Sequence, residues 1–591
     1  MRGRRMKHVF WTVVLVAAQT GLTAFAGPIS LDEIFAPTVV GVPPMYAGRT
    51  LCRTADGALR HYGQQMCKGT VTRVYIESRD EGLNWKTFLA DPKDVGAMVK
   101  CPWADYWLEF TNFEADPLAV ARSKTGPGDV RPERFVLPQR RYACTYLLPL
   151  ASRKRWLATF VELSCKRDGG YGAAYAYSDD DGQTWTFRDM PPVKDVRRRN
   201  PGSARDHWFC SGCEPSVVEM KDGSVVMCVR TSGPYASFFR STDGGATWGE
   251  PWQDKRFWQA NTRPDFLRLK DGRILFVWNN TQLLPEIDPK LTPGGERGVA
   301  GFTNRDALHA AISDDEGRTW RGFREIALSE WRNASDWREL GNDAAQEKDK
   351  SVHQTQMLEL KDGKVLIAYG QNVSTRRLMI FDPNWLLETK RKDNFQQGLA
   401  NVSHQLYVKS ASGGWRGWAG HCAWNRMPGA AMVLNPDVPM SNRGDVLQLG
   451  RVKDDRLISD RAGLVWNFPA RRKGKVGVNV RVLGEGFRFT LTDHWINPCD
   501  ETNPALSPVS VPFTAKELPC SKPVRPLKDW HDLVAEWDCD KGTVRFLVDG
   551  KVYAEQKLAW IPEAGFSYLH LQTLAEESDE LGSHFRVFWA E

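Results

Sequence analysis

Side chains that can exchange protons stand close together in two parts of the sequence. Arg205, Asp206 and His207 are consecutive and Glu214 follows shortly after them, whereas His353 lies much further along the chain. A histidine can act as a base or an acid near neutral pH, and a carboxylic acid with a raised pKa can donate its proton. His353, Asp206 and Glu214 are therefore candidate catalytic residues. The alternative for Asp206, His207 and His353 is a surface loop residue or a hydrogen-bonded buried residue.

Arginines accompany these groups along the chain. A guanidinium binds a carboxylate through two parallel charge-assisted hydrogen bonds, so Arg230 and Arg305 are candidates for holding an acidic ligand. Glu214 and Arg230 would alternatively form only a buried ion pair. Arg263, in NTRPDF, either points inward as a further cation for an acidic substrate or is a charge at the rim.

The elements that must position these side chains contain an eight-residue repeat, S-x-D-x-G-x-[TN]-W. Its four copies are SRDEGLNW from Ser78, SDDDGQTW from Ser178, STDGGATW from Ser241 and SDDEGRTW from Ser313. Each copy follows a strand-like run and precedes a shorter one, which predicts a hairpin turn. The Asp can accept hydrogen bonds from loop amides, the Gly supplies a positive φ and the Trp packs on the adjoining sheet. We therefore expect these aspartates to be structural.

A second repeat, two strands joined by Asp-Gly, alternates with the first. Its Asp-Gly turns stand at 56–57, 222–223, 271–272 and 362–363. Two hairpins in tandem make a four-stranded antiparallel sheet, and several such sheets are typical of the blades of a β-propeller. The radial arrangement hides the strand edges, so the repeat needs no helices. The sequence thus predicts an all-β fold.

The four eight-residue copies resemble Asp boxes, and residues 30–390 resemble the sialidase (neuraminidase) superfamily. This resemblance implies a six-bladed β-propeller and an exo-α-sialidase, a secreted glycoside hydrolase that removes a terminal acidic sugar. The family binds the sugar carboxylate with three arginines. It uses a Tyr nucleophile, a Glu base and an Asp acid, because a carboxylate nucleophile would be repelled by the acidic sugar. Asp boxes also occur in other propellers, so they indicate the fold.

Three residues stand at the offsets that the family uses. Glu214 lies nine residues before Gly223, as the family's base does, and Arg230 lies seven residues after that glycine. Arg305 lies eight residues before Ser313, in RDAL, as another of the three arginines does. The resemblance therefore implies that Glu214 is the base and that Arg230 and Arg305 bind the substrate carboxylate.

Other positions depart from the family pattern. Ala47 stands where the first arginine belongs, and Arg49 can replace it only if the strand shifts by an even step that keeps its face. The segment 61–76, where the acid belongs, contains no Asp or Glu. Gln354 stands nine residues before Gly363, at the place of the Tyr nucleophile, and is counted here as a substrate-binding candidate.

Three interpretations of these departures stay open. The chain is a true exo-α-sialidase whose acid and tyrosine come from other loops, or a sialidase-fold glycosidase or lyase of different specificity that uses His353 or Asp206. The third is a glycan-binding protein without turnover. All three predict a glycan partner, a sialoside or another acidic oligosaccharide, and none calls for a cofactor or a metal ion. Cys210 and Cys213 lack a second pair of metal ligands nearby, so a local disulfide or two buried thiols is expected there.

The carboxy-terminal third predicts a second domain. Its longer alternating strands are typical of a β-sandwich, and 530–558 resembles a hairpin of concanavalin-like (laminin-G-like) jelly rolls. We expect a propeller at 27–395 and an accessory jelly roll at 396–591, without an evident calcium or sugar site.

The amino terminus predicts export. Residues 1–26 combine a basic start, an apolar stretch and an Ala-x-Ala motif, as a secretory signal peptide does. We therefore expect a secreted or periplasmic monomer that has no membrane segment after cleavage. The net charge of +7 includes four positive residues of this segment, which leaves no excess that would indicate nucleic-acid binding. Export permits disulfides, and Cys52–Cys67 and Cys499–Cys520 are the predicted pairs.

Overall fold

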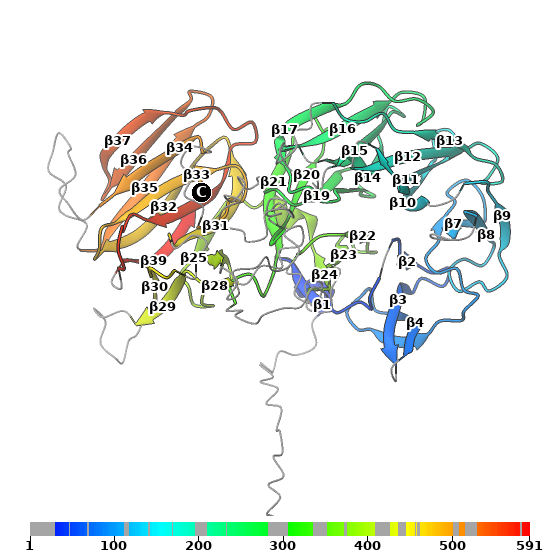
Figure 1. Ribbon diagram of the computed structural model, residues 1–591, viewed down its shortest axis with the longest axis horizontal. Helices are drawn as coiled ribbons and strands as arrows, with labels where there is room; N and C mark the ends of the chain where they lie inside the picture. The colour runs from blue at the N-terminus through cyan, green and yellow to red at the C-terminus, as the bar shows by residue number, and fades with distance from the viewer. Residues whose placement is uncertain are drawn as a thin grey trace, which may run out of the picture.

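The structure, a computed structural model, consists of β-strands and short 3-10 helices in its described part (Figure 1). The described residues are 30–46, 48–67, 70–111, 117–139, 142–167, 170–194, 210–231, 233–281, 305–334, 351–370, 375–407, 426–434, 445–455, 457, 461–499, 507–514, 529–579 and 582–591. In these ranges no helix is long and apolar enough to cross a membrane.

Six four-stranded antiparallel sheets form the first of two units in the described residues. The 3-10 helices beside them are η1 (Leu31–Glu33) and η3 (Pro383–Leu387). The sheets, in chain order, are β2 (Leu51–Arg53), β3 (Leu59–Cys67), β4 (Thr70–Ser78) and β5 (Lys86–Leu89); β6 (Val99–Lys100), β7 (Trp107–Thr111), β8 (Ala119–Ser123) and β9 (Glu133–Val136); β10 (Tyr142–Leu150), β11 (Arg155–Arg167), β12 (Gly170–Ser178) and β13 (Thr186–Asp189); β14 (Ser211–Glu219), β15 (Val225–Thr231), β16 (Tyr235–Ser241) and β17 (Trp252–Trp258); β18 (Asp265–Arg268), β19 (Ile274–Trp278), β20 (Ala307–Ser313) and β21 (Arg321–Leu328); and β22 (Gln356–Glu359), β23 (Val365–Tyr369), β24 (Arg377–Phe381) and β1 (Thr38–Gly41). Figure 1 shows them around a common centre, with β2, β10, β14 and β22 nearest to it.

The ring is closed by strands from its two ends. β1 pairs antiparallel with β24, Thr38 opposite Ile380 and Val39 opposite Met379. The last sheet therefore combines the start of the described chain with residues 356–381. This arrangement is a β-propeller, as predicted, and the six sheets are the number that six blades require.

The Asp boxes form the turns between the third and fourth strands of their sheets. In the first copy, Asp80 Oδ1 accepts hydrogen bonds from Ser78 Oγ (2.7 Å) and the Asn84 amide (2.9 Å), and Trp85 Nε1 donates to the Gly82 carbonyl (2.8 Å). The bonds from the Ser hydroxyl and the loop amide recur at Asp180, Asp243 and Asp315. Gly82 has φ 93°, the left-handed conformation that a Cβ disfavours. The predicted structural role of these aspartates is confirmed.

The second unit is a β-sandwich. One sheet contains β25 (Arg391–Asp393), β29 (Ala430–Leu434), β30 (Asp445–Leu449), β32 (Lys473–Val482), β35 (His531–Asp538), β36 (Thr543–Val548), β37 (Lys551–Lys557) and β39 (Ser583–Ala590). The other contains β26 (Val402–Ser403), β31 (Gly463–Arg471), β33 (Phe487–Thr492), β34 (Val509–Phe513) and β38 (Phe566–Thr573). A two-stranded sheet pairs β27 (Gln405–Tyr407) with β28 (Arg426–Pro428). Both large sheets contribute to one apolar core, which includes Trp466, Val478, Phe489 and Phe588. Because β25 already pairs with β39, the sandwich includes residues ahead of the expected boundary at 396.

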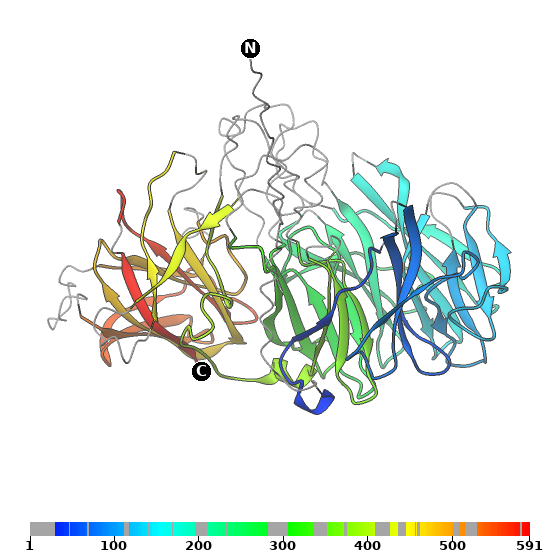
Figure 2. The ribbon, with the colours of Figure 1, turned by 90° about the horizontal axis from the view of Figure 1, so that it is seen from below.

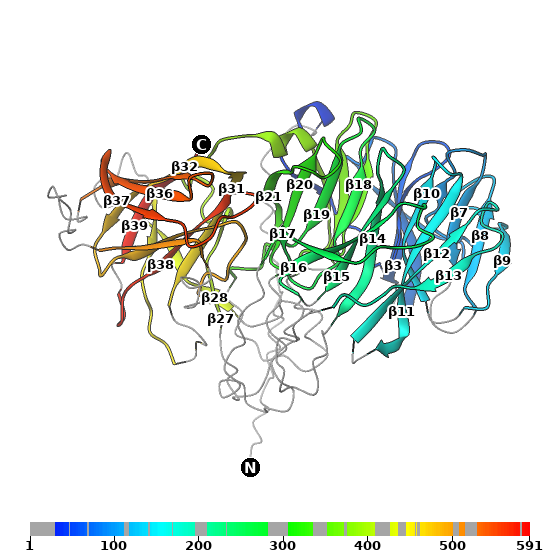
Figure 3. The same cartoon turned by 90° about the horizontal axis from the view of Figure 1, so that it is seen from above.

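The sandwich packs against the blade of β18 to β21 and the last strand of the blade before it, β17, and Figures 2 and 3 show the two units side by side. His494 of the sandwich stacks on Trp258, with 3.8 Å between ring centroids. Tyr568 of β38 donates its hydroxyl hydrogen bond to Glu325 Oε1 of β21 (2.8 Å). Trp495 and Ile496 are buried in a small apolar cluster with Ala307 of β20. The interface is therefore closely packed and carries buried polar contacts.

The predicted disulfide between Cys52 and Cys67 is wrong. Cys52 of β2 is a free, buried thiol that lies opposite Arg60, whereas Cys67 ends β3 seven residues further along and lies opposite Thr70. A strand rises about 3.3 Å per residue, so the two positions are too far apart for a bridge. Cys520 lies outside the described residues, and Cys499–Cys520 stays a prediction.

Candidate active site

Glu214 lies near the centre of the propeller and contacts two of the predicted site residues. Arg230 Nη1 of β15 donates to Glu214 Oε2 (2.7 Å), and Gln354 Nε2 donates to Glu214 Oε1 (3.1 Å). Gln354 comes from the entry to β22, far along the chain. The resemblance described above would place a tyrosine at this position. The residue there is Gln354, whose side-chain amide is hydrogen-bonded to the Glu214 carboxylate.

Three of the residues in this cluster have a left-handed backbone. The φ values are 44° for Glu214, 52° for Asn261 and 57° for Gln354. Such a conformation is costly for residues other than glycine and persists only where the surrounding structure imposes it, often at functional sites. Glu214 also lies in a bulge of β14, where the register with β15 shifts between Cys213 and Ser216. The bulge re-aims the Glu214 side chain relative to a regular strand.

Asn261 joins two of the arginines. Its side-chain oxygen accepts a hydrogen bond from Arg230 Nε (3.0 Å), and its backbone carbonyl accepts one from Arg305 Nη2 (2.9 Å). Arg305 Nη1 also lies 3.3 Å from His353 Nε2. Arg305 and His353 are each only 1% exposed. These contacts bring Arg305 and His353 into one cluster with Glu214, and both are more deeply buried than Glu214 and Arg230.

Arg263 and Asp265 form a second buried pair beside this cluster. Arg263 Nη2 lies 3.4 Å from Asp265, whose other contacts are the hydroxyls of Thr355 (2.9 Å) and Ser216 (3.3 Å). Because Ser216, Asp265 and Thr355 come from three neighbouring blades, this carboxylate ties their inner strands together. Arg263 points inward, one of the two orientations that the sequence left open.

The surroundings of Glu214 favour its ionised form. Burial raises the pKa of the carboxyl group, but the charge of Arg230, its hydrogen bond and that of Gln354, and the charge of Arg263 together lower the pKa below its ordinary value of 4.5. Glu214 is therefore a carboxylate at neutral pH and can accept a proton. A nucleophilic or general-base role needs this form.

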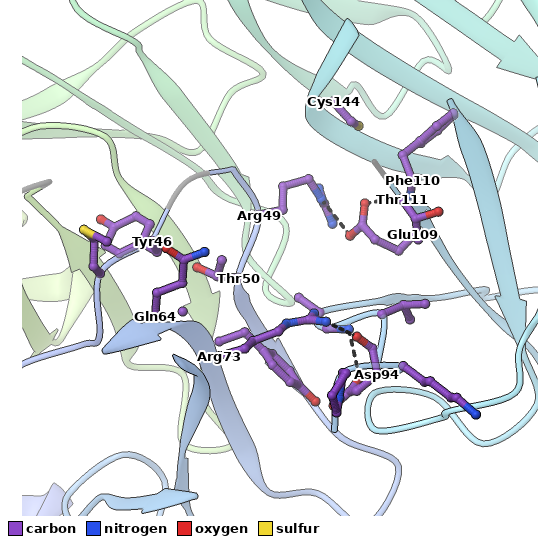
Figure 4. A pocket seen from close by; sticks show the side chains of 18 of the residues that line it. Tyr46, Arg49, Thr50, Gln64, Arg73, Asp94, Glu109, Phe110, Thr111 and Cys144 are labelled. Atoms are coloured by element: carbon purple, nitrogen blue, oxygen red, sulfur yellow. Dashed lines mark hydrogen bonds and ion pairs between the residues drawn. The ribbon is translucent and has the colours of Figure 1, made fainter. Parts of the chain in front are cut away.

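A cavity of about 580 Å³ adjoins this cluster (Figure 4). Arg49 and Glu109 both line it and form an ion pair, with Arg49 Nε 3.2 Å from Glu109 Oε2. Tyr46 also lines the cavity and donates its hydroxyl hydrogen bond to the Gln354 carbonyl (3.0 Å). Tyr46 and Gln354 thus connect the cavity to Glu214. Burial raises the pKa of Tyr46, which disfavours a phenolate nucleophile there.

Glu109 differs from Glu214 in its electrostatic surroundings. Burial raises the pKa of Glu109 above its ordinary 4.5, and Arg49 offsets this only in part. Glu109, Tyr46, Asn261 and Asp265 were not among the residues predicted from the sequence. The one sequence signal that could have found them is weak: Asn tolerates the left-handed conformation better than most residues, and Asn261 stands ahead of a strand.

The structure brings most of the predicted site residues together. The central cluster contains Glu214, Arg230, Arg305, His353 and Gln354, with Arg263 beside them. Arg49 lines the adjoining cavity. Asp206 lies outside the described residues, as does His207. Among the residues that the structure describes, no group of three or more His, Cys, Asp or Glu side chains could hold a metal ion.

The comparisons with known proteins bear on the propeller. Residues 143–335 match the BNR repeat-like domain family. This BNR repeat-like segment runs from β10 to β21 and so includes Glu214, Arg230 and Arg305. No curated protein matches the chain.

Three solved structures illustrate what this chain is similar to. Trypanosoma rangeli sialidase is 13% identical with a TM-score of 0.33, covering 94% of each chain. A Dyadobacter fermentans protein of unknown function is 15% identical with a TM-score of 0.34, covering 58% of this chain and 98% of its own. NanB, solved with Optactamide, is 12% identical with a TM-score of 0.37, covering 61% and 71%. At such identities and TM-scores, a functional assignment has to rest on the residues of this chain.

Proposed function

We propose that the protein is an exported, exo-acting glycoside hydrolase that removes a terminal acidic sugar, with an α-linked sialic acid as the first candidate. The observation that carries this proposal is the ionised Glu214 within a cluster of arginines. Arg230 contacts it directly, Arg305 is joined to Arg230 through Asn261, and Arg263 lies close enough to lower its pKa. A substrate that carries a carboxylate fits such a cationic surrounding.

In this proposal Glu214 and Glu109 each carry out one of the two proton transfers of the hydrolysis. The pKa of Glu214 is lowered and that of Glu109 is raised, and opposite shifts of this kind separate a base from an acid. In the proposed reaction Glu109 protonates the oxygen of the departing group as the glycosidic bond breaks. Glu214 takes a proton from the water that bonds to the anomeric carbon. Gln354 holds Glu214 in position and supplies no nucleophile.

The arginines have different tasks in this scheme. Arg230 and Arg305 bind the carboxylate of the sugar, and Arg49 supplies a cation in the adjoining cavity, where its guanidinium is oriented by Glu109. Arg263 remains bound to Asp265 and raises the local positive potential. His353, buried against Arg305, keeps that arginine in place.

A screen of exo-glycosidase substrates tests the proposal. The panel contains sialosides, uronides and neutral α-sugars, and release of an acidic sugar is the expected result. Glu214→Gln should reduce kcat by at least about a hundredfold while binding of the same substrate persists. Asp180→Asn, which alters an Asp box away from the cluster, is the matched control and should retain turnover. Release of neutral sugars only would contradict the assignment.

A second function, glycan binding without turnover, is favoured by one observation. Gln354 occupies the place of the family's nucleophile and donates its amide to Glu214. An amide cannot attack an anomeric carbon, so the cluster would then serve recognition alone. Binding of an acidic glycan that is lost on Arg230→Ala, together with no release from any substrate of the panel, would establish this alternative.

A further inference from the structure

Two cysteines lie directly before Glu214 and contact each other. The Sγ atoms of Cys210 and Cys213 are 2.6 Å apart, far closer than residues three apart come in a regular strand, where they are separated by about 10 Å. Gly212, with φ 127°, lies between them in a backbone conformation that favours glycine. In the register with β15, Ser211 lies opposite Thr231 and Cys213 opposite Arg230, so the β14 strand carries an extra residue here.

This bulge is joined to the strand that carries Arg230. In its thiol form Cys210 donates a hydrogen bond to the Arg230 carbonyl (3.1 Å), and the two cysteines are 1% and 2% exposed. Glu214 follows Cys213 immediately and has the left-handed φ of 44°. Fixing the position of Cys213 therefore fixes the start of the bulge from which Glu214 reaches Arg230.

We propose that Cys210 and Cys213 are oxidised to a disulfide that fastens this bulge and so positions Glu214 against Arg230. The oxidant is a small-molecule disulfide of the kind present in oxidising compartments. The thiolate of Cys210 attacks one sulfur of that disulfide and displaces the first thiol, and the thiolate of Cys213 then attacks Cys210 and displaces the second. The two cysteine protons pass to the two departing thiols. Both cysteines are buried in the fold, so the reaction takes place before β14 is covered.

The Cys210–Cys213 link does not depend on the proposed glycosidase. A disulfide restricts the unfolded chain and holds its loop in the folded one. It would fasten the same bulge in a glycan-binding protein. Its test can therefore fail or succeed independently of any enzymatic activity.

Mass mapping of the full chain, folded with oxidised and reduced glutathione, tests the link. After denaturation and alkylation without reductant, the tryptic peptide that contains both cysteines should carry no alkyl group and weigh two hydrogens less than its reduced form. Cys101 and Cys228, buried thiols elsewhere in the propeller, are internal controls and should be alkylated. Alkylation of both Cys210 and Cys213 would overturn the proposal.

A stability measurement tests whether the link fastens the bulge. Wild-type protein refolded under oxidising conditions should unfold at a Tm a few degrees above that of protein refolded with reductant, because the link stabilises the folded state. Cys210→Ser should show a smaller Tm difference between the two conditions than the wild type does, and Cys101→Ser should keep the wild-type difference. Equal Tm values for the two wild-type preparations would refute the proposal that the link fastens the bulge. If a variant fails to fold, the peptide masses still decide whether the Cys210–Cys213 bond forms.

Discussion

Asp306 of the propeller and Arg426 of the sandwich form an ion pair in which neither side chain is exposed. Arg426 Nη1 lies 2.7 Å from Asp306 Oδ1, and Gln405 of the same two-stranded sheet donates to Asp306 Oδ2 (3.4 Å). Asp306 directly follows Arg305, so the sheet of β27 and β28 holds the residue next to a proposed substrate-binding arginine. The sandwich thus contributes to the support of the site.

Replacing Arg426 should destabilise the whole chain. Arg426→Met leaves the Asp306 carboxylate buried without its partner charge, which typically costs about 3–5 kcal/mol. We expect the free energy of unfolding, measured in urea, to fall by that amount. The double variant Asp306→Asn, Arg426→Met should recover part of the loss, because the uncompensated charge is gone.

Lys453→Met is the matched control for this prediction. Lys453 pairs with Glu577 on the surface, where both side chains are largely exposed. Exposed pairs contribute about 0–1 kcal/mol, so this variant should unfold almost as the wild type does. Equal losses for Arg426→Met and Lys453→Met would contradict a structural role for the buried pair.

The propeller could be predicted because its signals are local. Each Asp box determines its own turn through bonds within eight residues, as the contacts of Asp80 with Ser78 and Asn84 show. The disulfide between Cys52 and Cys67 could not be judged in this way, because it depends on the register between β2 and β3. The tight packing of His494 on Trp258 joins two units far apart in the chain, and no local pattern encodes such a contact.

The site could be predicted only where a residue keeps a fixed offset from a repeat. Glu214 and Arg230 flank an Asp-Gly turn, and the structure brings them into contact. Glu109 stands in no repeat, and it meets Arg49 only because β7 of one blade lies beside the segment that leads into β2 of the neighbouring blade. Its raised pKa arises from burial, which a sequence without coordinates does not reveal.

The Asp-box carboxylates should make stability depend on pH in the acid range. Burial raises the pKa of Asp243, but hydrogen bonds from Thr247 and Ser241 lower it to about 2, from an ordinary 3.8. A depressed pKa means that the stabilisation is present above pH 3.8 and is lost as the pH falls toward 2. Asp243→Asn should unfold with a shallower pH dependence in this window, measured by urea titration at each pH. An unchanged slope would argue against this linkage.

Tyr568 should matter for the contact between the two units. Its hydroxyl donates to Glu325, which is partly buried, and it also contacts His309, which is fully buried. Tyr568→Phe removes the hydroxyl, so Glu325 and His309 lose a hydrogen-bond partner, which costs about 1–3 kcal/mol. Thermal unfolding should show the loss. Tyr553→Phe, which lies at the edge of the sandwich core, is the control and should change the Tm much less.

The pH profile of the proposed hydrolase should be a bell whose acidic limb lies below pH 4.5 and whose alkaline limb lies above it. Burial raises the pKa of Glu214, but Arg230 and Gln354 bring it below 4.5, so the base becomes active as the pH rises through a value under 4.5. Burial raises the pKa of Glu109 above 4.5, so the acid loses its proton, and activity falls, at a higher pH. Gln354→Leu removes a bond to the carboxylate and should move the acidic limb of kcat/KM upward. Glu109→Gln should abolish the alkaline limb together with most of the turnover. A profile in which Gln354→Leu leaves the acidic limb in place would show that Glu214 does not titrate in it.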